Sequence, residues 1–456
     1  MSRRLYPIAA ALAAVVALSS CTGTTPGGDD AKKAGAKADA PEISVTAPDK
    51  TIKAGGKLKL SVANGKFQKV EVTDADHSSA PADTGVMNPK TKSTATATET
   101  AKAGGNLALT STDQTTAATD PTDTSDAESS AATDDSGSLS DTQASAEPTE
   151  QGTTWSSKYG LAGSSTYNWK ATVVDDNGNT QEKTGTVKTA KPKGEATGIN
   201  PIISDGQTVG VGAPILLYFN TIVTDKNKAA VESRLKVTAT DKDGKKRNVE
   251  GTWAWLPVED GISRLNYRPK EYWPAHTNVK VELPLKNVQY AANRFGKKDV
   301  NFSFKVGREQ IATGNAKTHR FKVERNGKEI WNWPASLGRP AAPSYNGVHV
   351  VMSKHANYTM KSERWNYTTP TQWSVRIQNN GEFVHAAPWS EGSQGSANVS
   401  HGCINLSNSR AYKYYKSALY GDPVIIKGSS VKLSKSNSDV IDWVYDWDEY
   451  KEMSAL

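Results

Sequence analysis

Alternating apolar and polar residues predict β-strands along most of this chain beyond its first 40 residues. Residues 43–46 and 58–62 alternate in this way, and the pattern returns at residues 166–174 after a long interruption. The Asp-Asp-Asn-Gly sequence at residues 175–178 predicts a hairpin turn into a further strand. We therefore expect a small immunoglobulin-like β-sandwich over residues 41–190, interrupted by an insertion.

A second run of short strands follows a Lys-Pro-Lys-Gly linker at residues 191–194. Residues 215–219, 252–256 and 300–306 have strand patterns, and Gly, Asp and Pro turns separate them. Short strands at this spacing are typical of an immunoglobulin-like sandwich. The second sandwich is expected over residues 195–306, with a spacing role.

The pattern stays β-rich over residues 308–428 but includes one helix. Residues 407–419 carry Ala411, Tyr415 and Ala418 on one helical face, and Gly421 ends the pattern. The predicted fold class is mainly β, with two sandwiches followed by a β-rich domain that has one or two helices. A Trp-rich segment at residues 429–456 is expected to pack back on the domain before it.

Composition separates the front of the chain from the rest. The chain has 456 residues, and none of its 12 Trp lies in the first 154. Residues 106–150 hold ten acidic residues and no Lys or Arg. Because this segment has few apolar side chains to bury, folding could not offset the conformational entropy that the chain would lose. We therefore predict a disordered acidic insertion over about residues 76–152.

Charge and cysteine content exclude several classes of protein. The 2 Cys, Cys21 and Cys403, are too few for a disulfide framework or a Cys-rich zinc site. A net charge of +7 suits an anionic partner or surface. Basic residues do not alternate with aromatic residues in a stripe, so no nucleic-acid partner is predicted.

The N-terminus has the pattern of a secretory signal. Arg3 and Arg4 precede an apolar run at residues 8–18, which is too short to cross a bilayer. The sequence Leu-Ser-Ser-Cys ending at Cys21 resembles a bacterial lipobox. This resemblance implies a signal peptide over residues 1–20, lipidation of Cys21 and a membrane anchor; the alternative is an ordinary signal peptide that contains a Cys.

The mature chain is then expected outside the cytoplasm, anchored to the outer face of the cell membrane and reaching into the cell wall. Residues 21–40 are small, polar and rich in Gly and Lys, which predicts a flexible tether.

A cysteine and a histidine suggest acyl-transfer chemistry. Cys403 lies in Ser-His-Gly-Cys-Ile-Asn, and His385 ends a predicted strand 18 residues earlier. A thiolate attacks acyl groups, and an imidazole can take the thiol proton and return it to a leaving amine. Gly402 leaves room for backbone N–H groups to face an oxyanion.

Other interpretations of these residues remain open. Cys403 could be a buried structural cysteine beside a surface histidine. A zinc site is disfavoured because no His-x-x-x-His pair or nearby carboxylate set accompanies the candidate ligands. Those candidates are His349, His355, His385, His401 and Cys403.

Residues 383–390, 395–398 and 400–407 together resemble the catalytic signature of bacterial L,D-transpeptidases with a YkuD-type domain. That signature is a His, a spacer of about fifteen residues and Ser/Thr-His-Gly-Cys-x-Asn. Residues 206–212 and 253–256 are similar to the second sandwich of multidomain actinobacterial lipoproteins in this family. The resemblance implies that residues 308–428 form the catalytic domain.

The resemblance also implies roles for individual residues. Cys403 would be the nucleophile and His385 its base, oriented by the backbone carbonyl of Ala386, where relatives often have Ser. Backbone N–H groups of Gly402 and Cys403, with His401, would form the oxyanion hole. Asn405 would hold the loop together with His401. The remaining implied site residues are two lid residues, Tyr367 and Met360, the cleft-wall residue Trp389, and Ser400 of the motif.

The implied reaction joins peptidoglycan stems without a cofactor or metal. Cys403 would cleave the bond between the third residue of a tetrapeptide stem and its terminal D-Ala, leaving a thioester. The side-chain amine of a second stem's third residue would resolve it into a three-to-three cross-link. Carbapenems are expected to acylate the same thiol.

Two other functions remain open. Water could replace the amine acceptor and give an L,D-carboxypeptidase. The chain could also be a non-catalytic wall-binding lipoprotein that keeps the fold as a scaffold. The intact histidine and cysteine motif argues against that second alternative.

Overall fold

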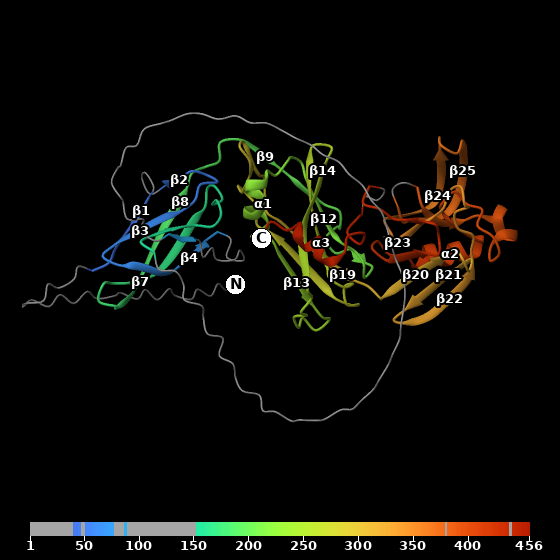
Figure 1. Ribbon diagram of the computed structural model, residues 1–456, viewed down its shortest axis with the longest axis horizontal. Helices are drawn as coiled ribbons and strands as arrows, with labels where there is room; N and C mark the ends of the chain where they lie inside the picture. The colour runs from blue at the N-terminus through green and yellow to red at the C-terminus, as the bar shows by residue number, and fades with distance from the viewer. Residues whose placement is uncertain (1–39, 47–50, 77–85, 89–151, 379–380, 437–439) are drawn as a thin grey trace, which may run out of the picture. The chain divides into compact units, whose positions relative to one another are not determined.

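The computed structural model describes residues 40–46, 51–76, 86–88, 152–378, 381–436 and 440–456 (Figure 1). The described chain is mainly β with few helices, which confirms the predicted fold class. The predicted signal peptide, Cys21, nearly all of the predicted tether and most of the predicted acidic insertion lie outside the described residues. In the described part of the chain, no helix is long and apolar enough to cross a membrane.

The first group of strands forms two four-stranded sheets. β7 shows the alternation that predicts such a sheet, because every second side chain along it is buried. The predicted hairpin at residues 175–178 is confirmed by the antiparallel pairing of β7 with β8. The sheets have the orders β1-β3-β6-β5 (Glu42–Val45, Lys59–Ala63, Thr154–Ser156, Val86–Asn88) and β2-β8-β7-β4 (Thr51–Ile52, Thr180–Thr189, Thr166–Val174, Lys66–Asp74).

Strand β5 corrects the prediction for the insertion. Disorder was expected from about residue 76 to 152, but Val86–Asn88 pairs antiparallel with β6. The backbone N–H and C=O groups at the edge of β6 form hydrogen bonds with these three residues. Amino-acid composition does not reveal such a pairing strand elsewhere in the chain. The rest of the insertion, at residues 77–85 and 89–151, lies outside the described residues.

The second group of strands encloses an aromatic core. Trp273, Tyr290 and Phe304 are each at most 2% exposed there. Helix α1 (Asp225–Glu232) lies between β12 and β13, where the sequence did not predict a helix. The sheets are β10-β12-β15-β14 (Ile199–Pro201, Ile215–Phe219, Ile262–Pro269, Gly251–Glu259), β11-β19-β16-β13 (Thr208–Val209, Val300–Val306, Asn278–Leu283, Lys236–Thr240) and β17-β18-β9 (Gln289–Ala291, Arg294–Gly296, Glu195–Thr197).

The third group of strands forms a six-stranded and a four-stranded sheet. The orders are β22-β21-β20-β28-β23-β29 (Lys328–Pro334, Arg320–Arg325, Gln310–Asn315, Pro423–Lys427, Tyr345–Val350, Val431–Lys432) and β24-β25-β26-β27 (Ser353–Ser362, Tyr367–Arg376, Phe383–Ala386, Ile404–Leu406). The predicted helix is present as α2 (Asn408–Ser417). Its buried Ala411 and Tyr414 share a core with residues of both sheets, and Phe321 meets the Tyr414 ring edge-on.

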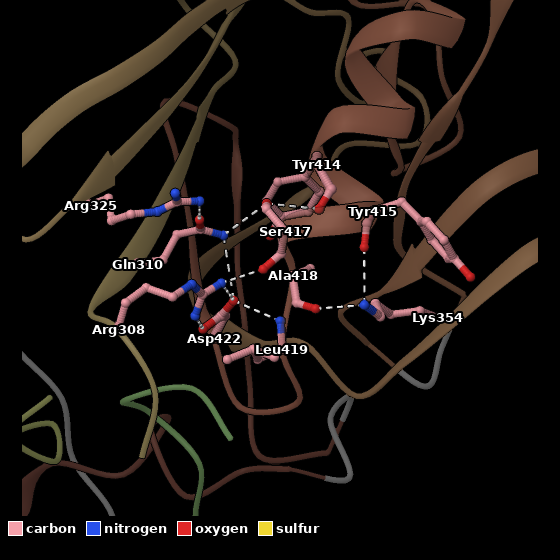
Figure 2. Close-up of polar contacts among 10 residues, drawn as sticks. All are labelled: Arg308, Gln310, Arg325, Lys354, Tyr414, Tyr415, Ser417, Ala418, Leu419 and Asp422. Carbon is pink, nitrogen blue, oxygen red and sulfur yellow. Dashed lines mark hydrogen bonds and ion pairs between the residues drawn. The ribbon is translucent and has the colours of Figure 1, made fainter. Parts of the chain in front are cut away.

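A polar network fixes the C-terminal end of α2 (Figure 2). The Arg308 guanidinium donates to both Asp422 carboxylate oxygens at 2.7 and 2.6 Å and to the Ser417 carbonyl. Asp422 also accepts from Leu419 N, and Lys354 donates to the carbonyl of Ala418 at 2.7 Å. These bonds satisfy carbonyl groups that a helix end leaves without intrahelical partners.

The C-terminal segment corrects a second prediction. It was expected to pack on the preceding domain, and β29 at its start does pair with β23 there, but the residues from Ile441 onward contact β14 and β15 of the second sandwich. Ile441 and Tyr450 form a cluster with Leu256, and the buried Asp442 carboxylate accepts from Asn266. The face of β14 and β15 that it covers combines apolar Leu256 with polar Asn266 and Arg268, which donate to Asp442 and to the Tyr445 carbonyl; the local sequence of the segment does not show these partners. The segment ends in a short helix, α3 (Trp447–Glu452).

Candidate active site

Two neighbouring parallel strands bring the predicted histidine and cysteine together. β26 ends with His385 and Ala386, and β27 begins one residue after Cys403. His385 pairs with Asn405 in the register of these strands. The spacer that separates the two motif halves is thus a crossover connection between parallel strands, and it contains the 3₁₀ helix η2 (Pro388–Ser393).

The imidazole of His385 is buried, with only 3% of the residue exposed. Its Nδ1 lies 2.8 Å from the carbonyl oxygen of Ala386. Since a carbonyl can only accept, Nδ1 carries the hydrogen and Nε2 keeps a lone pair. Burial lowers the pKa of His385 to about 4, against the hydrogen bonds to Ala386 and Asn405. The ring is therefore neutral at pH 7 and can accept a proton.

The thiol of Cys403 is also buried, with 6% of the residue exposed. It donates to the carbonyl oxygen of Gly381 at 3.4 Å. Burial raises the pKa of Cys403 to about 12; a backbone hydrogen bond from Phe383 opposes this shift. In this structure the site holds a neutral thiol and a neutral imidazole, so the thiol must lose its proton as it attacks.

Hydrogen bonds shape the loop before Cys403. Ser400 Oγ donates to the Cys403 carbonyl at 2.6 Å and accepts from Gly402 N. Ser344 Oγ donates to the Gly402 carbonyl at 2.5 Å. Gly402 has φ +122°, which side chains rarely adopt. In this structure Gly402 N thus bonds to Ser400, although an oxyanion-hole role was expected for it.

A cavity of about 430 Å³ opens beside the thiol. Eight of the ten expected catalytic and substrate residues line it: Cys403, His385, His401, Asn405, Tyr367, Met360, Trp389 and Ser400. Gly402 instead lines a second cavity of about 570 Å³, which shares Met360, Tyr367 and His401 with the first. Ala386 lines neither and contributes its carbonyl to His385.

The β24–β25 hairpin forms one side of the cavity. Met360 packs with Phe383 and Cys403, and Tyr367 joins the same cluster. The Tyr367 ring lies 5.1 Å from the His401 ring, which Trp365 also approaches at 5.4 Å. On another side, Trp389 is 59% exposed and its ring is 6.1 Å from that of His385.

Sequence reasoning missed one acidic group close to the site. Glu382 lies just before β26 with its carboxyl group buried. The only signal for Glu382 was a single acidic residue directly preceding the apolar strand residues Phe383 and Val384. Nothing in that pattern shows that its side chain faces the protein interior.

Comparisons with known proteins agree with this geometry. Residues 309–426 match the family model of the L,D-transpeptidase catalytic domain, and residues 133–289 match that of a bacterial Ig domain. The chain is 40% identical over 296 residues to L,D-transpeptidase 5 of Mycobacterium tuberculosis, covering 64% of this chain and 63% of that protein.

Two further relatives come from the same species. L,D-transpeptidase 2 is 31% identical, with 55% of this chain and 60% of that protein covered. L,D-transpeptidase 1 is 34% identical, with 49% and 82% covered. The matches to L,D-transpeptidases 5 and 2 therefore span less than two thirds of those proteins.

Among solved structures, the chain is similar to an L,D-transpeptidase in complex with imipenem. The identity is 33%, the match covers 51% of this chain and all of that one, and the TM-score is 0.42.

Proposed function

Because this chain belongs to the L,D-transpeptidase family, we propose that it is a cysteine acyltransferase that forms three-to-three cross-links between peptidoglycan stems. The observation that carries the proposal is the His385–Ala386 hydrogen bond on a strand adjacent to the Cys403 loop. It leaves an unprotonated imidazole nitrogen available for the thiol proton, at a cavity lined by both residues.

Acylation begins with the neutral thiol and imidazole. Cys403 Sγ attacks the carbonyl carbon between the third stem residue and the terminal D-Ala, and the thiol proton passes to His385 Nε2. The carbonyl oxygen becomes negatively charged and accepts a hydrogen bond from the backbone N–H of Cys403. One such donor lowers the barrier by about 3 kcal/mol.

Collapse of this intermediate breaks the C–N bond. The imidazolium returns its proton to the leaving nitrogen, D-Ala departs and a thioester remains on Cys403. The side-chain amine of a second stem's third residue then attacks the thioester and loses a proton to His385. As the C–S bond breaks, the imidazolium returns this proton to the Cys403 sulfur, which restores the thiol, and a new amide bond joins the two stems.

Several residues hold this arrangement. Asn405 Nδ2 donates to Ser390 Oγ at 3.2 Å, and Ser400 Oγ bonds both sides of the Gly402–Cys403 peptide. Tyr367, Met360 and the exposed Trp389 provide the apolar surface against which a stem can lie. The His401 ring contacts the rings of Trp365 and Tyr367, and these contacts help to fix the loop.

The proposal includes a location in the cell wall. A lipid on Cys21 would anchor the chain to the outer face of the membrane. The described second sandwich, through Arg308, leads directly into the catalytic domain. The sandwiches would then extend the active site from the membrane towards its substrate.

Product analysis tests the reaction. The full-length chain is incubated with a disaccharide-tetrapeptide that serves as donor and acceptor, and products are identified by mass spectrometry. A dimer that has lost one D-Ala supports the proposal. A tripeptide product without dimer identifies an L,D-carboxypeptidase, and unchanged substrate at a folded protein favours the scaffold alternative.

A further inference from the structure

Glu382 is a buried acid next to the nucleophile that the proposed mechanism does not use. The residue is 3% exposed, and its Oε1 accepts a hydrogen bond from Tyr345 N at 3.0 Å. A Cβ atom added at Gly402 would lie 3.5 Å from both Cγ and Oε1 of Glu382. The carboxyl group therefore lies directly against the loop that carries Cys403.

The other carboxyl oxygen faces a histidine with which it makes no hydrogen bond. Glu382 Oε2 is 3.8 Å from His349 Nδ1, and both atoms are buried without a hydrogen-bond partner among the described residues. His349 Nε2 lies 2.8 Å from the Tyr345 carbonyl oxygen. A neutral ring whose hydrogen is on Nε2 has only a lone pair at Nδ1.

This arrangement has a simple protonation state. An ionised carboxylate would put two lone pairs opposite each other in a buried site, at a large cost in free energy. A proton on Glu382 Oε2 removes this opposition of two lone pairs, although the 3.8 Å separation is too long for a hydrogen bond between the two atoms. The site then carries no net charge.

We propose that Glu382 is a positioning residue of the proposed transpeptidase, held as a neutral carboxylic acid that faces His349 and supports the Gly402–Cys403 loop. Its neutrality keeps negative charge away from the sulfur and the carbonyl oxygen, both of which become negative during acylation. The inference rests on the proposed function, because it concerns the acylation of Cys403.

Burial is consistent with this state. It raises the pKa of Glu382 to about 8, although the Tyr345 N–H favours the ionised form. Burial also lowers the pKa of His349, although contacts with the Tyr345 and Ile377 backbones oppose this. An ionised Glu382 raises the pKa of Cys403, so ionisation makes the thiol a poorer nucleophile.

The remaining charged and titratable neighbours lie around the same cavity. The Arg376 guanidinium packs 4.4 Å from the Phe383 ring centre and favours the Cys403 thiolate. The groups that line the cavity with Glu382 are Tyr345 of β23, Tyr358 and Lys361 of β24, Tyr367 and Arg376 of β25, Arg364 and His401.

The pH dependence of acylation tests the proposal. Full-length wild type and Glu382→Gln are mixed with imipenem between about pH 6 and about pH 10, and the adduct is timed by intact-protein mass spectrometry. The glutamine keeps an acceptor for Tyr345 N and can present an N–H group towards His349 Nδ1, but it cannot ionise. Near neutral pH we expect the two rates to agree within about threefold.

Above pH 8 the two proteins should differ. The wild-type rate should fall by about tenfold per pH unit as Glu382 ionises, and Glu382→Gln should lack this decline. His385, with a pKa of about 4, stays neutral throughout this range in both proteins. Identical alkaline profiles would overturn the proposal, as would a wild-type rate without any decline.

A second measurement does not depend on the variant or on activity. Carboxyl ¹³C resonances of glutamate-labelled wild type are followed through the same pH range. A buried carboxyl that titrates near pH 8 supports the proposal, whereas full ionisation of every glutamate at pH 7 contradicts it. If imipenem acylates the wild type at no pH, the proposed function fails while this titration still decides the state of Glu382.

Discussion

The Nδ1 atom of His385 lies 2.8 Å from the carbonyl oxygen of Ala386. This contact uses only backbone from residue 386, so it needs no particular side chain there. It fixes the tautomer and leaves Nε2 as the basic nitrogen. The hydrogen bond therefore decides which atom of the ring can take the thiol proton.

Burial of His385 should make the stability of the protein depend on pH. Its pKa is about 4 in the folded chain against a reference of 6.5, so between these values only the unfolded chain binds a proton. The stabilisation is complete above pH 6.5 and is lost as pH falls towards 4. At pH 5 the loss is about 2 kcal/mol.

Thermal unfolding of wild type and His385→Gln at pH 7 and pH 5 measures this effect. The wild type should lose more stability than the variant over this interval. An equal loss in both proteins would mean that His385 titrates normally in the folded chain.

Gly402→Ala should reduce acylation by about 100-fold because it strains the loop next to the nucleophile. Its φ of +122° disfavours any side chain, and small displacements of reacting groups cost large factors in rate. Gly178→Ala is a matched control, since its φ is +83° and an added Cβ meets nothing within 4 Å. Carbapenem acylation rates of the two variants should differ although both carry backbone strain.

Trp389→Ala should weaken substrate capture without destabilising the fold. The side chain is 59% exposed, so the free energy of unfolding should change by less than about 0.5 kcal/mol. The variant should have a raised KM for the tetrapeptide donor. Val258→Ala, at 49% exposed in the second sandwich, is the control and should leave KM unchanged.

Arg308→Met should destabilise the catalytic domain by about 3 kcal/mol or more. Asp422 is 1% exposed and would lose its ion-pair partner, which leaves a buried charge uncompensated. Lys69→Met removes an exposed ion pair with Glu71 and should cost less than about 1 kcal/mol. Calorimetry should record a clear fall in unfolding temperature for the first variant alone.

Local patterns predicted much of the fold because they reflect which side chains are buried. The alternation over residues 166–174 corresponds to β7, and the helical face predicted over residues 407–419 corresponds to α2. Helix α1 escaped prediction because tertiary contacts stabilise its short, polar sequence. Buried Glu232, for example, accepts from Trp255 Nε1 and from Ala455 N.

Long-range packing accounts for the other differences. Asp442 is buried by Asn266, 176 residues away, so no local signal could direct the C-terminal segment to the second sandwich. The same limit applies to Glu382, whose neighbours His349 and Gly402 come from distant parts of the sequence. For the motif residues themselves, side-chain chemistry already pointed to Cys403 and His385 and the resemblance implied their roles, but spacing alone did not show that parallel strands bring them together.

The most direct test of the central claim is the mass of the full-length protein after exposure to imipenem, compared with Cys403→Ala. The account predicts one covalent adduct per chain on wild type, located at Cys403, and none on the variant. An unmodified wild type that is folded, or an adduct that persists in Cys403→Ala, would contradict the assignment of Cys403 as the nucleophile.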